Sequence, residues 1–210
     1  MVLIQDGTIS KCSNSGDVSL TGENTWYGVA GIAGTGGSTE CNTQIEYCYN
    51  EGKITLELSN SKSGQVAGIV GNLGMDESGT YTGYVINCYN KGEIGCVGSS
   101  STPVVAGIGS WGRHIVVRNC YNSGKTNNEN GAITRGIWGN YSTTVDSTFE
   151  NNYWLDSCGA VYGVGVVNNN VGAEPKTEIE FKSLATILGE DYAQSEKINN
   201  GYPYLKENRP

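Results

Sequence analysis

A five-residue phrase, Cys-Tyr-Asn-x-Gly, recurs along this 210-residue chain and constrains its fold more than any other feature. Full copies begin at Cys48, Cys88 and Cys120, a variant copy begins at Cys12, and an eroded copy begins at Asn152. The four cysteines are 36, 40 and 32 residues apart (12 to 48, 48 to 88, 88 to 120). Self-similarity at such intervals is typical of stacked repeats, in which each unit contacts its neighbours along one axis. The sequence therefore predicts a single elongated array.

Each copy also contains segments with the alternation of a half-buried strand, such as Ile54 and Leu56 around Thr55. A second phrase of the type Val-Ala-Gly-Ile follows, and its central glycine lies 19, 20, 19 and 16 residues after the successive cysteines. Three short strands per copy, with glycine at the corners, predict one coil of a parallel β-solenoid, also called a β-helix. The general preference for right-handed crossovers predicts a right-handed coil. We expect roughly four full coils and a degenerate fifth.

Each position of the phrase predicts one role in the stack. Gly52 and its equivalents follow an asparagine and one variable residue, so we expect them at corners with φ > 0. The asparagines are expected to hydrogen-bond from coil to coil. Ile45 and Cys48 are an odd number of residues apart, so a bend must lie between them if both are buried. The tyrosines are expected to form an aromatic ladder of Tyr49, Tyr89, Tyr121 and Tyr153.

Charged residues support one register of stacking. The position after the glycine reads Asp17, Lys53, Glu93 and Lys125, which alternates in sign from copy to copy. Opposite charges on neighbouring strands stabilise a sheet and like charges destabilise it. One residue fits less well. Arg135 occupies a position that is alanine in the other copies, so this face is either partly exposed or covered at the end of the array.

Composition excludes several classes of protein. The net charge of −8 and a pI near 4.7 argue against nucleic-acid and anionic-membrane surfaces, which need clustered Lys and Arg. No run approaches the roughly 18 apolar residues of a membrane helix. The seven cysteines cannot all pair internally, and four of them share one repeat position. We expect that column to be buried packing, because parallel Cβ vectors disfavour disulfides and a straight row cannot surround a metal ion.

The composition changes after the repeats. We divide the chain into β-solenoid repeats over residues 1–172, with copies near 9–34, 45–71, 85–110, 117–139 and a degenerate copy at 149–167, and a C-terminal cap over 173–210. Thr177 and Glu180 match a capping box, and Phe181, Leu184 and Leu188 follow at helical spacing. This predicts a short helix at about 178–188, followed by a turn and a short strand. We expect the helix to form a lid over the open apolar end of the solenoid.

The two recurring phrases, together with the closing segment Ile-Asn-Asn-Gly-Tyr-Pro-Tyr-Leu, resemble the GLUG-motif repeats of large bacterial surface proteins. The resemblance covers roughly residues 9 to 205. It implies an extracellular, adhesin-like β-solenoid segment on the bacterial cell surface, within a larger surface protein whose signal and anchor lie outside this segment. It implies no catalytic residues. The first and fourth copies depart from the pattern.

Little in the sequence points to chemistry. His114 has no positioned nucleophile, no metal motif is present, and the glycine-rich stretches lack the ending of a phosphate loop, so we predict no catalytic residues, no metal and no cofactor. Some β-helices cleave polysaccharides with carboxylates that cluster on one face. The candidates for such an enzyme here are Asp76, Glu77 and Asp146.

The preferred hypothesis is a non-catalytic structural or adhesive segment whose variable loops bind a glycan or a host surface protein. Exposed aromatic side chains can stack on sugars or anchor a protein partner. A carbohydrate-active enzyme (a polysaccharide hydrolase or lyase) is the first alternative, and a passive stalk or spacer is the second. The candidate binding residues, which we place in the variable loops, are Trp26, Tyr27, Tyr81, Tyr84 and Trp111.

Overall fold

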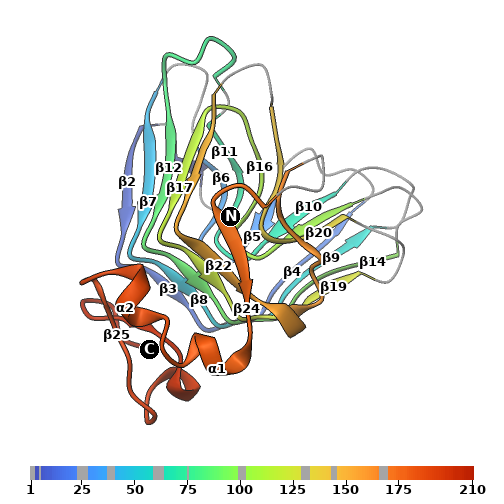
Figure 1. Cartoon of the computed structure of the whole chain (residues 1–210). Coiled ribbons are helices and arrows are strands. Elements are labelled where there is room, and N and C mark those ends of the chain that lie inside the picture. Colours follow the sequence, from blue (N-terminus) through green and yellow to red (C-terminus); the bar gives the residue numbers. More distant parts are fainter. Residues whose placement is uncertain are drawn as a thin grey trace.

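A computed structural model of the chain describes residues 3–4, 6–22, 28–36, 41–58, 64–74, 76–98, 103–128, 133–142, 146–165 and 170–210. The described residues form an all-β protein in which parallel sheets stack as a β-solenoid, as the sequence predicts. Figure 1 shows the sheets wrapped around a common axis, with the C-terminal segment lying beside β3 and β8. The β-solenoid fold class is confirmed.

Two of the parallel sheets carry the beginning of each copy. Sheet B contains β2 (Gly7–Ser10), β7 (Thr43–Glu46), β12 (Gly83–Ile86), β17 (Ile115–Arg118) and β21 (Thr148–Glu150). Sheet C contains β3 (Ser13–Asn14), β8 (Tyr49–Asn50), β13 (Tyr89–Asn90), β18 (Tyr121–Asn122), β22 (Asn152–Leu155) and β24 (Ala173–Lys176).

The other two parallel sheets carry the rest of each copy. Sheet D contains β4 (Val18–Gly22), β9 (Ile54–Leu58), β14 (Ile94–Val97) and β19 (Thr126–Asn128). The first limb of sheet A contains β5 (Val29–Ala30), β10 (Gln65–Ala67) and β15 (Val104–Ala106). Its second limb contains β1 (Leu3–Ile4), β6 (Ala33–Gly36), β11 (Val70–Leu73) and β16 (Gly109–Gly112). The long strand β20 (Ile133–Tyr141) joins both limbs and pairs with β23 (Tyr162–Val164).

A complete copy therefore uses more strands than the sequence predicts. The second copy forms β7, β8, β9, β10 and β11 in the described part of the chain, where three strands were expected. The extra breaks have local causes. One lies at the bend before the cysteine, and the other lies at the glycine of the Val-Ala-Gly-Ile phrase, where the chain turns from the first limb of sheet A into the second.

The predicted bend between Ile45 and Cys48 is present, but the predicted positive φ at the glycine is wrong. The left-handed residue is the one before the cysteine, as at Tyr47 (φ 51°) and Asn87 (φ 52°). The glycine is needed because the coils approach closely. A Cβ added to Gly92 would lie far inside van der Waals contact of the Gly52 carbonyl oxygen in the coil below, so a larger residue cannot stack there.

The asparagines form the predicted ladder inside the solenoid. The Nδ2 atom of each asparagine donates a 2.7 Å hydrogen bond to the Oδ1 atom of the next, from Asn14 through Asn50 and Asn90 to Asn122. The same Nδ2 atoms also donate to the carbonyl of the glycine two residues on. Across the interior, Gly68 faces this ladder so closely that an added Cβ would lie 2.5 Å from Asn90 Cγ.

The tyrosines lie on the opposite, outer side of sheet C and form a shorter ladder than predicted. The rings of Tyr49 and Tyr89 stack at 5.0 Å, and those of Tyr89 and Tyr121 stack at 4.9 Å. Tyr153 is in register on β22, but the ring that meets Tyr121 is Phe181, edge-on at 5.7 Å. The Tyr153 hydroxyl donates instead to Asn151 Oδ1 at 2.6 Å. The ladder therefore ends at Tyr121.

Three of the four cysteines in the column are buried packing, as predicted, whereas Cys12 of the first copy is exposed, which corrects the prediction at that position. The thiols of Cys48, Cys88 and Cys120 are buried and free, and each lies within hydrogen-bonding reach of nearby backbone carbonyls, as Cys120 Sγ does at 3.2 Å from Arg118 O. Burial raises the pKa of the Cys88 thiol well above its usual range. In the fifth copy Asn152 takes over the position. Its Nδ2 donates to Val117 O at 3.0 Å, so the change from cysteine keeps a bond to the neighbouring coil.

The charge column confirms the predicted register. Lys53 and Glu93 form an ion pair of 2.9 Å, and Lys91 pairs with Glu51. The exception at Arg135 is also explained. Its side chain is buried next to β23, where its Nε donates to Gly165 O at 2.8 Å and its guanidinium lies 5.7 Å from the centre of the Tyr162 ring. The second of the two expectations, a covered end, is therefore correct.

The C-terminal segment is not a lid over the end of the array. We call residues 177–210 the C-terminal strap. It contains two one-turn helices, α1 (Glu178–Phe181) with the predicted capping box and α2 (Ala185–Leu188), in place of one helix. The strap also contains the antiparallel pair β25 (Tyr192–Ala193) and β26 (Tyr204–Leu205). The apolar side chains of the strap pack along the outer tyrosine ladder, because the tyrosine rings would otherwise face water. The strap residues in this contact are Phe181, Leu184, Ala185, Leu188, Tyr192 and Leu205.

Candidate functional site

The aromatic residues selected from the sequence do not form one group. Trp26 and Tyr27 lie outside the described residues. Tyr84 lies on strand β12, on the side opposite the buried Val85, and is half-buried. Trp111 lies on β16 and is also half-buried. Tyr84 and Trp111 are therefore strand residues, whereas the sequence placed them in loops.

Trp111 and Tyr81 border the corner where the second limb of sheet A turns into sheet B. We call residues 74, 76–82 and 111–114 the corner site. Arg113 places its guanidinium 5.3 Å from the centre of the Trp111 ring and forms an ion pair with Glu77. The Glu77 side chain is 73% exposed. On the other side, His114 Nδ1 lies 3.1 Å from Tyr81 O and 3.3 Å from Thr82 Oγ1. The corner site thus combines aromatic, cationic and anionic groups near the surface.

Asp76 anchors the loop of the corner site. Its carboxylate accepts hydrogen bonds from the backbone N–H groups of Ser78 (2.9 Å), Thr80 (2.7 Å) and Tyr81 (2.8 Å), and from the Ser78 hydroxyl at 2.8 Å. These bonds, led by the one from Tyr81, lower the pKa of Asp76 from 3.8 to about 2. A carboxylate that stays ionised and is closed in by its own loop suits a structural role better than that of a general acid.

The three carboxylates of the enzyme hypothesis have different environments. Asp76 is 4% exposed and bonded within its loop, while Glu77 pairs with Arg113. Asp146 is exposed and precedes β21, on a different copy. Within the described residues, no group of three or more His, Cys, Asp and Glu side chains is arranged to hold a metal ion. A catalytic carboxylate pair works from opposite sides of one bond, so both members must face the same site.

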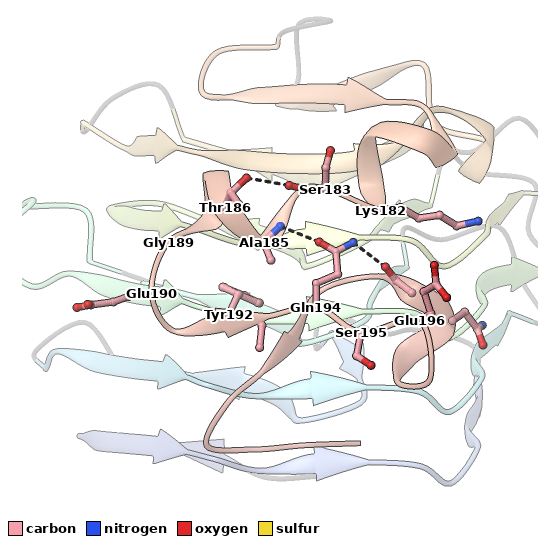
Figure 2. Close-up of a pocket in the computed structure, with 13 residues that line it drawn as sticks. Lys182, Ser183, Ala185, Thr186, Gly189, Glu190, Tyr192, Gln194, Ser195 and Glu196 are labelled. Atoms are coloured by element: carbon pink, nitrogen blue, oxygen red, sulfur yellow. Dashed lines mark hydrogen bonds between the residues drawn. The ribbon is translucent and has the colours of Figure 1, made fainter.

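A groove in the C-terminal strap was not predicted from the sequence. It is a cavity of about 1060 Å³ that opens to solvent. Figure 2 shows the Gln194 side chain in this groove, with dashed hydrogen bonds on two sides of its amide, one of them to Ala185. The Gln194 amide accepts from Ala185 N at 3.3 Å and donates to Phe181 O at 3.1 Å and to Gly201 O at 2.6 Å. The groove is lined by Lys182, Ser183, Ala185, Thr186, Gly189, Glu190, Tyr192, Ala193, Gln194, Ser195, Glu196, Asn200 and Gly201.

The signal for this groove in the sequence is weak. Its residues come from a stretch without repeats, and two of its determinants are backbone conformations. Asn199 and Asn200 both have positive φ values (51° and 56°), which asparagine tolerates better than most residues. The Asn-Asn-Gly triplet of the closing segment is the feature that could have indicated an unusual turn here.

Among solved structures, one described as a candidate immunoglobulin A1 protease from Bacteroides ovatus is similar to this chain. It aligns with a TM-score of 0.65 and 18% identity, covering 96% of this chain. The alignment spans 58% of the length of that protein. Identity this low shows the fold alone. No protein-family model matches the chain, and no curated protein matches it in sequence. In the described part of the chain, no helix is long and apolar enough to cross a membrane.

Proposed function

We propose that this chain is a non-catalytic adhesive segment of a bacterial surface protein, related to the GLUG-motif repeats and located outside the cell. One observation carries the proposal. The repeated positions all contact the neighbouring copies, through the asparagine, tyrosine and cysteine columns. Specific recognition is therefore left to the positions that do not repeat, in the way that loops on a rigid scaffold carry binding in many proteins.

The non-repeating positions with the best chemistry for binding are Trp111 and Tyr84. Both are partly exposed on strands that the stack holds rigidly, and a rigid aromatic ring loses little conformational entropy when it binds. Arg113 and Glu77 next to Trp111 add polar groups that can hydrogen-bond a sugar hydroxyl. A glycan is the ligand class that fits this mixture best, and a host surface protein is the alternative ligand.

The competing function is a polysaccharide hydrolase or lyase. Its strongest residue would be Asp76, but four hydrogen-bond donors already occupy that carboxylate and its pKa is low. A general acid in a glycosidase needs a raised pKa, so that it holds a proton at neutral pH.

A glycan array and a reducing-sugar assay on the same glycans test the proposal. We expect binding without sugar release, and we expect Trp111→Ala or Tyr84→Ala to weaken it. Thr148→Ala is the matched control, because Thr148 occupies the position of Tyr84 two copies further on. Sugar release that is lost in Asp76→Asn or Asp146→Asn would instead establish the enzyme.

A further inference from the structure

One position on the outer face of sheet D lacks the side chain that its neighbours carry. The neighbouring Ile94 packs in the core, so position 95 of β14 faces outward. Figure 1 shows the four strands of sheet D side by side. In unbroken register, they place in one outward column Ser19, Thr55, Gly95 and Asn127. Gly95 therefore leaves a gap in a column of polar side chains.

The stacking of the coils does not require glycine at this position. A Cβ added to Gly92 would overlap the Gly52 carbonyl, whereas a Cβ at Gly95 would have its nearest contacts at 3.5 and 3.6 Å, both to Asn127. Glycine inside a strand otherwise marks a bulge, a tight bend, or a close approach by a ligand or another backbone. Strand β14 is continuous, pairs in register on both sides, and has no positive φ at Gly95. Approach by a ligand is the cause that remains.

The gap belongs to a surface cavity of about 280 Å³, which we call the Gly95 notch. The side chains that line it come from three neighbouring coils and are those of Lys53, Thr55, Glu93, Val97 and Asn127. Small-molecule sites begin at about 300 Å³, so the notch is of a size for one small ring. Among the described residues, no aromatic side chain lines it. A ligand here is therefore held by its polar edge and not by stacking.

The two charged groups of the notch balance each other. Lys53 Nζ lies 2.9 Å from Glu93 Oε1, and the two side chains remain 52% and 37% exposed. The hydrogen bond from Lys53, with a smaller contribution from Asn127, lowers the pKa of Glu93, although burial opposes them. The carboxylate accepts, the ammonium donates, and the Thr55 hydroxyl and Asn127 amide can do both. A neutral ligand with several hydroxyl groups matches this set, whereas an ion would meet a charge of its own sign.

We propose that the Gly95 notch binds the hydroxyl-bearing edge of a single neutral sugar ring. The ring edge enters the gap at Gly95, where Thr55 and Asn127 of the two neighbouring coils bind its hydroxyl groups. The Lys53–Glu93 pair binds a further hydroxyl at the side of the gap. Trp111 belongs to sheet A, so the notch on sheet D is a separate site and does not rest on the proposed function.

Nuclear magnetic resonance titration of the ¹⁵N-labelled full chain tests the proposal. The probes are the methyl glycosides of glucose, galactose, mannose and N-acetylglucosamine. We expect at least one of them, at millimolar concentration, to cause saturable shifts of the Gly95 and Asn127 backbone amides. Gly95→Thr should abolish these shifts, because it fills the gap with the side chain that stands at Thr55. The matched control is Ser19→Thr, in the same column outside the notch, which should bind like the unmodified protein.

A second variant keeps the test independent of the first. Thr55→Val removes one hydroxyl and keeps the shape of the side chain, so it should weaken binding several-fold. Circular dichroism and urea unfolding establish that each variant is folded. Absence of saturable shifts with all four glycosides, or unchanged binding in folded Gly95→Thr, would overturn the proposal. Shifts caused by sodium acetate or methylammonium chloride in place of the glycosides would also overturn it.

The notch and the proposed function fail separately. Trp111→Ala should leave the titration of the Gly95 and Asn127 amides unchanged. Glycoside shifts that are lost in Trp111→Ala would assign the sugar to the corner site and overturn the notch. Shifts that persist in Trp111→Ala, with no Trp111-dependent binding on the glycan array, would support the notch and count against the proposed function.

Discussion

Asn50 and Asn90, which are 40 residues apart in sequence, are joined by a 2.7 Å hydrogen bond from Nδ2 to Oδ1 inside the solenoid. Both side chains are fully buried. An asparagine amide has two donor hydrogens, and here one binds the next coil while the other binds the glycine carbonyl of its own coil. The ladder therefore provides hydrogen-bond partners for asparagine amide groups that are buried away from solvent.

Asn90→Ala should lower the free energy of unfolding by about 1–3 kcal/mol, because it leaves buried partners of the amide without hydrogen bonds. Urea unfolding followed by circular dichroism measures this change. Asn14→Ala is the matched control, because Asn14 stands at the half-exposed end of the ladder and water can replace its partners. Equal losses in the two variants would contradict the buried ladder.

Gly92→Ala should prevent folding or destabilise the protein severely, because the new methyl group would overlap the Gly52 carbonyl of the coil below. Gly95→Ala should be tolerated. A Cβ at Gly95 has its nearest contacts at 3.5 and 3.6 Å, both to Asn127, and neither glycine has a positive φ. Yield of soluble protein and thermal unfolding of the two variants check this pair. A stable Gly92→Ala protein would argue against the observed coil spacing.

Phe181→Ala should destabilise the attachment of the C-terminal strap by about 3–5 kcal/mol, the usual cost of removing a buried phenylalanine. Phe181 is fully buried and meets the rings of Tyr121 and Tyr202. Limited proteolysis of residues 177–210 measures how readily the strap opens. The control is Ile179→Ala on the same helix, since Ile179 is 83% exposed. If both variants were cleaved at the rate of the unmodified protein, the packing of the strap on the tyrosine ladder would be refuted.

Asp76 makes stability depend on pH in acid. The pKa of Asp76 is about 2 in the folded protein and 3.8 in an unfolded chain, so the folded state favours the ionised form. The stabilisation is complete above the unfolded value near 3.8 and is lost as the pH falls towards 2. Asp76→Asn should therefore destabilise the protein at pH 6, with a difference that shrinks between pH 4 and pH 2 as Asp76 becomes protonated. Urea titrations of both proteins at several pH values measure it, and a constant difference would contradict this role.

The repeats made the stack and its register predictable, because identical residues at corresponding positions predict columns. The charge alternation at Lys53 and Glu93 supported the same register and is confirmed. The location of the strap was harder to predict from the sequence. Tyr49 and Asn50 are adjacent in an extended strand, so one faces in and the other faces out. That alternation indicates an apolar outer face on sheet C, which requires a cover at its side and not at its end.

The strand breaks and the strap groove were harder to predict for physical reasons. Asn87, Asn119 and Asn151 precede the cysteine position and favour the left-handed conformation, but Tyr47 and Lys11 occupy the same position and obscure the signal. The groove depends on Gln194 meeting Ala185 and Gly201 in a segment without repeats. The placement of Tyr84 and Trp111 on strands likewise depended on where each strand began.

The repeated Cys-Tyr-Asn-x-Gly phrase stacks each coil on the next through its tyrosine rings. Nuclear Overhauser effects between these rings, measured on a sample with selectively labelled tyrosine, test this stacking. The structure predicts cross-peaks between Tyr49 and Tyr89 and between Tyr89 and Tyr121, whose ring centres are 5.0 and 4.9 Å apart. It predicts none between Tyr49 and Tyr121, which are separated by a whole coil. A cross-peak between Tyr49 and Tyr121, or the loss of either expected one, would contradict the stacked register.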